Sequence, residues 1–229
     1  MSFFESLFHA FFCAIIPYCK LGKKACNTIG WEMIRKMVSL SSILEHNQQF
    51  VQERKYEPYQ TTKFPKKKLV IVSCMDTRLT ELLPQAMGLR NGDAKIIKNA
   101  GAIVSHPFGS VMRSILVAVY ELEAEEVCIV GHRECGMSGL NAASILNKAK
   151  DRGVEEKCLS LLEHAGVDLE TWLTGFHSVE ESVAHSVNMV RHHPLLPEEV
   201  PVHGLVIDPG TGTLDVVVDG YETVKGGCS

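Results

Sequence analysis

The sequence lacks an excess of charge of either sign. It has 23 basic and 27 acidic side chains in 229 residues, which gives a formal net charge of -4. Because nucleic-acid-binding proteins carry a basic excess and disordered tails carry blocks of like charge, we expect neither a nucleic-acid partner nor an acidic tail. Hydrophobic residues make up 45% of the chain, enough for one full core.

Long hydrophobic runs are also missing. The apolar stretch near the N-terminus ends at Pro17 and is too short to cross a bilayer. Glu5 rather than a basic residue opens it, which argues against a signal peptide. Six apolar side chains share one helical face in this stretch: Phe3, Phe4, Leu7, Phe8, Phe11 and Ile15.

Residues 1–36 therefore form an N-terminal extension with three open interpretations. It is a helical arm that packs on a partner subunit, a peripheral helix with weak membrane contact through residues 1–16, or a segment outside the folded domain. Met37 precedes a well-formed helix start and is a candidate start of the natural protein.

The cysteines are too few and too unevenly spaced for a disulfide-stapled secreted scaffold. The eight cysteines are at positions 13, 19, 26, 74, 128, 135, 158 and 228. A reducing compartment fits this pattern better, so we expect a cytoplasmic protein. In such a compartment, a cysteine at the end of a strand is a candidate metal ligand or nucleophile.

Neither an internal repeat nor a low-complexity linker interrupts the chain. We expect one domain over residues 37–224, followed by a tail at 225–229. Short β-branched runs predict strands, and helical patterns lie between them. The predicted strands cover 69–72, 94–97, 126–131, 204–207 and 214–218, and the predicted helices cover 39–55, 80–87, 109–122, 138–164 and 179–192.

This order of elements predicts the fold class α/β. Alternating strands and helices indicate a mostly parallel central sheet with right-handed crossovers. The last two strands are joined by a Pro/Gly turn and predict an antiparallel pair at a sheet edge. The expected sheet has about four parallel strands plus an antiparallel C-terminal edge strand, and helices flank it.

Two polar motifs follow the first and third predicted strands. Cys74, Asp76 and Arg78 belong to "SCMDTR", whereas His132 and Cys135 belong to "GHRECGM". Ligands of open α/β sheets gather outside the carboxyl ends of the strands. Cys74 therefore meets His132 and Cys135 if the first and third strands are neighbours.

Two thiolates and an imidazole are good zinc ligands, and three protein ligands leave a fourth position open for water or substrate. Each residue alone has a simpler explanation, because a cysteine at a strand end is commonly a buried apolar residue. The pairing of H-x-x-C with C-x-D-x-R favours a site for Zn²⁺ formed by Cys74, His132 and Cys135.

These motifs resemble the β-class carbonic anhydrases, and most closely their compact bacterial branch. The resemblance covers about residues 39–221 and rests on Cys74-x-Asp76-x-Arg78, Asn99-Ala100-Gly101 and His132-x-x-Cys135. It implies a zinc lyase that reversibly hydrates carbon dioxide to bicarbonate and a proton by a zinc-bound hydroxide. It also implies a homodimer or a dimer of dimers, in which the 39–55 helix reaches across the partner.

The resemblance further implies that Asp76 and Arg78 are catalytic. Asp76 either accepts a hydrogen bond from the zinc-bound water or occupies the fourth metal position itself in a closed state. Bidentate pairing with Arg78 would hold the carboxylate away and leave the metal accessible. The alternative is a structural ion pair that only stiffens the loop.

Further pocket-lining candidates are Asn99, Gly101, His106 and Gly136. A loop histidine before Pro107 is also compatible with a purely structural role.

Two other functions stay open. The same scaffold can hydrolyse carbon disulfide or carbonyl sulfide, because a zinc hydroxide attacks similar linear electrophiles. A non-catalytic zinc or dithiol redox-sensing protein would use Cys74 and Cys135 but has no need of the Asp76–Arg78 pair.

Overall fold

The computed structural model describes residues 39–225. The expectations for residues 1–36 and for positions 226–229 lie outside these residues. The described part of the chain belongs to two compact units: one holds residues up to 58 together with 141–174, and the other holds 59–140 and the residues from 175 onward. The predicted extent of one domain over 37–224 stays a prediction. Within residues 39–225, no helix has the length and apolar character needed to cross a membrane.

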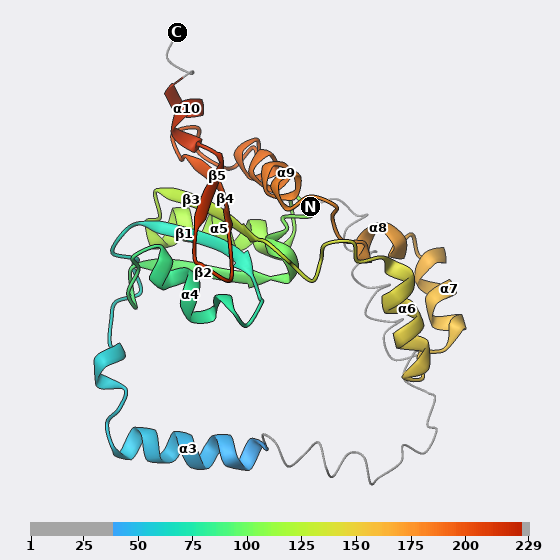
Figure 1. Ribbon diagram of the computed structural model, residues 1–229, viewed down its shortest axis with the longest axis horizontal. Coiled ribbons are helices and arrows are strands. Elements are labelled where there is room, and N and C mark those ends of the chain that lie inside the picture. The colour runs from blue at the N-terminus through green and yellow to red at the C-terminus, as the bar shows by residue number, and fades with distance from the viewer. Residues whose placement is uncertain (1–38, 226–229) are drawn as a thin grey trace. The chain divides into compact units, whose positions relative to one another are not determined.

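The second unit contains a sheet of five strands in the order β2-β1-β3-β4-β5 (Figure 1). The strands are β1 (Leu69–Cys74), β2 (Ala94–Asn99), β3 (Glu126–His132), β4 (Val202–Ile207) and β5 (Leu214–Val218). The pairs β1–β2, β1–β3 and β3–β4 are parallel, whereas β4–β5 is antiparallel. The predicted mostly parallel sheet with an antiparallel C-terminal edge is confirmed.

Four longer helices accompany this sheet: α4 (Leu79–Ala86), α5 (Ser110–Leu122), α9 (Val179–Arg191) and α10 (Gly220–Lys225). Two 3-10 turns are shorter: η3 (Ala100–Ala102) follows β2, and η2 (Glu57–Tyr59) covers the point in the sequence where the first unit ends and the second begins. The sheet therefore receives its crossover helices where the sequence predicts them.

The central strands are buried on both faces. All six residues of β1 are buried, which explains the continuous apolar run in the sequence. One hydrophobic cluster joins the strands to α5 and α9 and includes Met112, Ile115 and Val187. A second cluster includes Leu79 and Leu83 of α4. The core thus lies between the sheet and helices on each side, and it leaves the strand ends free to carry polar groups.

Strand register brings the two polar motifs to one edge of the sheet. In the β1–β3 pair Ser73 lies opposite Val130, and in the β1–β2 pair Cys74 lies opposite Asn99. Parallel strands end at the same edge, so the residues that leave β1 and β3 emerge side by side. The neighbouring position of the first and third strands, on which the metal site depends, is confirmed.

The first unit contains α3 (Leu40–Gln52), α6 (Ala142–Asp151), α7 (Glu156–His164) and α8 (Leu169–Leu173). The single helical pattern expected over 138–164 is wrong. Asn141 caps α6 by accepting a hydrogen bond from the Ser144 N–H, so that helix begins later. Gly153 has a φ of 96°, a left-handed conformation that ends the helix and separates α6 from α7. The short helix α8 was not expected from the sequence.

Candidate metal centre

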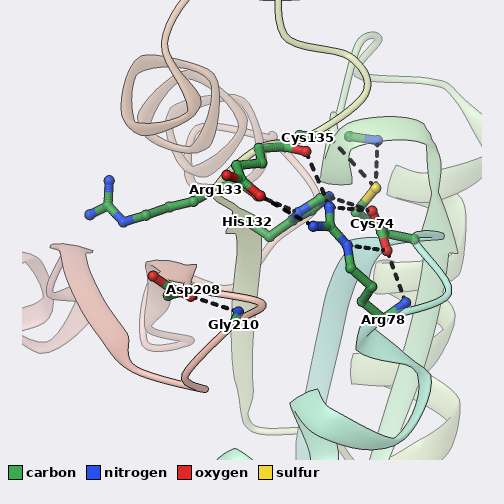
Figure 2. Close-up of polar contacts among 10 residues, drawn as sticks. Cys74, Arg78, His132, Arg133, Cys135, Asp208 and Gly210 are labelled. Carbon is green, nitrogen blue, oxygen red and sulfur yellow. Dashed lines mark hydrogen bonds and ion pairs between the residues drawn. The ribbon is translucent and has the colours of Figure 1, made fainter.

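Three potential metal ligands converge at the carboxyl edge of the sheet. Cys74 ends β1, His132 ends β3, and Cys135 lies in the loop after β3. Their ligand atoms all lie within 4.8 Å of one another, and the two Sγ atoms are 3.8 Å apart (Figure 2). All three side chains are buried. The structure therefore brings together the three residues that the motifs predict as ligands.

His132 presents one ring nitrogen to this cluster. Its Nδ1 lies 2.8 Å from the carbonyl oxygen of Arg133. Because a carbonyl only accepts, the proton belongs on Nδ1 and the lone pair on Nε2. That Nε2 is buried and has no hydrogen-bond partner within residues 39–225. A buried nitrogen without a partner is costly, and a metal ion would satisfy it.

Both thiols are buried beside each other, and the environment of Cys135 disfavours a free nucleophile. Burial, together with a smaller contribution from the neighbouring Cys74, raises the pKa of the Cys135 thiol to about 11. Such a thiol loses its proton near neutral pH when a sulfur-binding cation replaces it. The Gly101 N–H donates to Cys74 Sγ at 3.4 Å, which fixes the position of the sulfur. The donor set fits a metal ion that prefers sulfur and imidazole.

Asp76 lies beside the ligands and is held by Arg78. The Arg78 Nε and Nη2 donate to Asp76 Oδ1 and Oδ2 at 3.1 and 2.9 Å, and the Arg78 backbone N–H donates to Oδ1 at 2.9 Å. These hydrogen bonds lower the pKa of Asp76 to about 2, so the side chain is a carboxylate. Its Oδ2 is 3.8 Å from His132 Nε2. One carboxylate oxygen thus borders the three ligand atoms.

Glu134 connects the two motifs and was missed from the sequence. Arg78 Nη2 donates to the backbone carbonyl of Glu134 at 3.2 Å, and Nη1 donates to the Glu134 carboxylate at 3.4 Å. Glu134 has a φ of 55°, which is uncommon for a residue other than glycine. Its place next to Cys135 was the available signal. The contact itself joins residues 56 positions apart, which no spacing rule predicts.

Arg133 points the opposite way. Its guanidinium extends away from the ligands (Figure 2) and donates to Glu180 of α9 at 3.3 Å and to Asp215 of β5 at 2.6 Å. Its backbone N–H donates to the Ile207 carbonyl at 3.0 Å. Arg133 therefore ties the loop after β3 to two neighbouring elements, while its carbonyl orients His132.

A cavity of about 310 Å³ opens beside the ligands. Two segments line it: His132–Cys135 with Ser138 from the loop after β3, and Phe176–Glu180 leading into α9. The cavity thus reaches from two of the ligands to residues that the sequence motifs did not indicate. Residues 176–180 follow the predicted motif by some 40 positions, and only the fold brings them to it.

The predicted pocket residues Asn99, Gly101, His106 and Gly136 do not line this cavity. Asn99 is half-buried, and its Nδ2 donates to the Ile103 carbonyl at 2.7 Å. His106 is exposed, and its Nδ1 accepts from the Phe108 N–H at 3.0 Å. Gly136 is exposed. Their assignment to a substrate pocket stays a prediction.

Gly101 has a clear local role. Its φ is 77°, and a Cβ there would lie 3.0 Å from Met137 Cγ and 3.1 Å from Phe176 Cε1. A side chain would therefore be strained in conformation and crowded by two neighbours. Glycine at this position lets the backbone N–H reach the Cys74 sulfur.

Comparisons with known proteins agree with this geometry. A family model described as carbonic anhydrase matches residues 69–214. The chain is 81% identical over 190 residues to YvdA of Bacillus subtilis, which is itself only provisionally named a carbonic anhydrase; the match covers 83% of this chain and 96% of YvdA. The crystal structure of β-carbonic anhydrase isoform I from Trichomonas vaginalis has a TM-score of 0.74 and 33% identity, and the match covers 81% of this chain and all of that one.

A more distant relative bears another name. A carbon disulfide hydrolase from Acidithiobacillus thiooxidans is 31% identical over 157 residues, which is 65% of this chain and 76% of that protein. The sequence motifs, the sheet order, the buried Cys-His-Cys cluster and the family match together decide the family. This chain belongs to the β-class carbonic anhydrases.

Proposed function

We propose that this protein binds Zn²⁺ through Cys74, His132 and Cys135 and reversibly hydrates carbon dioxide to bicarbonate and a proton. The observation that carries the proposal is the buried cluster of three ligand atoms beside an arginine-held carboxylate. Structural zinc sites use four protein ligands, whereas three leave a position for a reacting molecule. Family membership supports carbon dioxide and bicarbonate as the substrates.

Zinc at this site would act as a Lewis acid and lower the pKa of water so that a nucleophile is available at neutral pH. The chain's own residues prepare the position. The Arg133 carbonyl fixes the ring of His132 with Nε2 facing the two thiols. The Gly101 N–H donates a hydrogen bond to the Cys74 sulfur and holds it in place. Two thiolates and a neutral imidazole together balance the charge of a divalent ion.

Asp76 and Arg78 are proposed to gate the fourth position. In this structure, both oxygens of Asp76 are held by Arg78 and the carboxylate borders the ligands without joining them. Oδ2 can then accept a hydrogen bond from the reacting water and orient it. Rotation of the carboxylate out of the pair would bring it to the fourth position and close the site.

The proposal is tested by stopped-flow measurement of carbon dioxide hydration on protein of measured zinc content. We expect about one zinc per chain and a hydration rate that scales with zinc content across partly loaded samples. Cys135→Ser, which removes one of the ligands, should lose both zinc and activity. Full zinc content without hydration in the wild-type protein would contradict the proposal.

A second candidate is hydrolysis of carbon disulfide, favoured by the 31% identity to a carbon disulfide hydrolase. The same zinc-loaded sample should be offered carbon dioxide and carbon disulfide in parallel, with sulfide release measured for the latter. Rapid sulfide release with slow hydration would favour this candidate over the first. A dithiol redox role is supported less, because it gives no function to the Asp76–Arg78 pair.

A homodimer or a dimer of dimers is the proposed assembly, with α3 as the arm that reaches the partner. No residue of α3 is buried, and four of its apolar side chains are more than half exposed: Leu40, Ile43, Leu44 and Val51. Such an apolar helix face is the kind of surface that a partner covers. Light scattering of the wild-type protein and of Leu44→Glu tests this assembly. The same molar mass in solution for both proteins would argue against an arm in α3.

A further inference from the structure

Hydration of carbon dioxide releases one proton per bicarbonate, and that proton has to leave a cavity whose ligands are buried. We propose that His177 carries this proton between the cavity and bulk buffer. The inference rests on the proposed function. In one turnover a C–O bond forms between water and carbon dioxide, one O–H bond of that water breaks, and the proton forms an N–H bond on the imidazole. A buffer base then removes it.

The backbone holds His177 at the wall of the cavity. The residue before it is tied to the loop that follows the ligands, because the Phe176 N–H donates to the Met137 carbonyl at 3.2 Å. The residue after it caps a helix, because Ser178 Oγ accepts from the Glu181 N–H at 3.2 Å. His177 therefore stands between two fixed positions and lines the same cavity as two of the metal ligands.

A close approach of α9 to β3 keeps this segment near the site. A Cβ at Gly131 would lie 2.7 Å from methyl groups of both Val179 and Val183. Glycine immediately before His132 thus allows the first turn of α9 to pack directly on the end of the strand. Because Val179 also lines the cavity, the helix start and His177 are placed by packing rather than by a flexible loop.

The ring of His177 is available for proton exchange. The side chain is exposed, and neither ring nitrogen has a hydrogen-bond or ion-pair partner within the described part of the chain. An imidazole exchanges protons near neutral pH, where hydration is expected to operate. It can therefore accept a proton on the cavity side and give it to buffer on the solvent side.

The other charged side chains that line the cavity already form hydrogen bonds or ion pairs. Glu134 accepts from Arg78, and Glu180 accepts from both Arg133 and the Ser178 hydroxyl. Hydrogen bonds, including those from the helix start and Ser178, lower the pKa of Glu180, so it is a poor proton carrier near neutral pH. The Arg133 guanidinium stays protonated. Among the cavity-lining residues, this leaves His177 as the imidazole that does not face the metal ligands.

The test is His177→Ala, assayed by stopped flow at low and high buffer concentration. If His177 carries protons, kcat in dilute buffer falls at least about tenfold, whereas kcat/KM, which reports the carbon dioxide step, stays within about twofold. Added imidazole or concentrated buffer should restore kcat. His185→Ala is the matched control, because His185 is an exposed histidine of α9 that does not line the cavity; both of its kinetic constants should be unchanged.

A second measurement needs no turnover. In protein loaded with paramagnetic Co²⁺ in place of zinc, the Cε1–H resonance of His177 should relax much faster than that of His185. Equal relaxation, or an unchanged kcat for His177→Ala in dilute buffer, would overturn the inference. An equal fall in kcat and kcat/KM that imidazole does not restore would also overturn it in favour of a structural role. A zinc-loaded wild type without hydration would overturn the proposed function itself, so the two failures are distinguishable.

Discussion

Two arginines flank the metal ligands, and each is paired with two carboxylates. Arg78 holds Asp76 and Glu134, whereas Arg133 holds Glu180 and Asp215. The chemistry of the pairs is alike, but their surroundings differ. The Asp76 side chain is only 19% exposed and borders His132, while the side chains of Arg133 and its partners are about half exposed. Because only the Asp76 carboxylate combines partial burial with a place beside the ligand atoms, we expect the Asp76–Arg78 pair to act in catalysis and the pairs of Arg133 to act structurally.

The largest expected effect comes from Arg78→Ala. Without the guanidinium, the Asp76 carboxylate is free to turn toward the metal position, and we expect hydration to fall by about a hundredfold or more. Zinc content should stay near that of the wild type, because no metal ligand is changed. Stopped-flow rates and metal analysis of the same sample measure both quantities. Full activity in this variant would mean that Arg78, like Arg133, has only a structural role.

The next effect is expected from Glu134→Gln. This change removes the negative charge 3.4 Å from Arg78 Nη1 but keeps the backbone carbonyl that accepts from Nη2. Because the bidentate pair with Asp76 is retained, we expect kcat/KM to change by less than about tenfold. A loss as large as that of Arg78→Ala would show that Glu134, rather than Asp76, is the partner that matters.

Arg133→Gln should affect stability more than activity. It breaks two ion pairs that are about half exposed, so the free energy of unfolding should fall by about 1 kcal/mol or less. The carbonyl that orients His132 belongs to the backbone and remains, and kcat/KM should stay within about threefold. Urea unfolding of the zinc-loaded protein and stopped-flow rates measure the two effects. A large loss of activity would mean that the ion pairs of the Arg133 side chain also position His132.

The smallest effect is a pH dependence from Glu180. Hydrogen bonds lower the pKa of its carboxyl from the ordinary value of 4.5 in the folded protein. A lowered folded pKa contributes stability that is present above 4.5 and is lost as the pH falls through the folded value. At neutral pH, the free energy of unfolding of the wild type should therefore be higher than that of Glu180→Gln, by less than about 1 kcal/mol. This difference should vanish at a pH well below the ordinary pKa. Urea unfolding of both proteins is measured at the same pH values, because both proteins lose metal at low pH and this loss cancels in the comparison. A difference in the free energy of unfolding that grows as the pH falls would contradict the prediction.

The sequence by itself determined the strands, the mostly parallel character of the sheet and the candidate ligand set. The β-branched run Leu69–Val72 predicts a buried strand, and the paired motifs at two strand ends favour a metal site, because both signals depend on residues close together in the chain. The break at Gly153 was missed because a helical pattern of apolar residues continues across it, while the backbone there turns left-handed.

Tertiary structure alone decided which groups surround the ligands. Glu134 reaches Arg78, and Phe176 and His177 reach the cavity, only because parallel register aligns β1 with β3 and because Gly131 lets α9 pack on the strand end. These contacts join residues tens of positions apart, so no local spacing encodes them. Periodicity records which residues are buried, whereas register and close packing decide which buried and half-buried groups face one another.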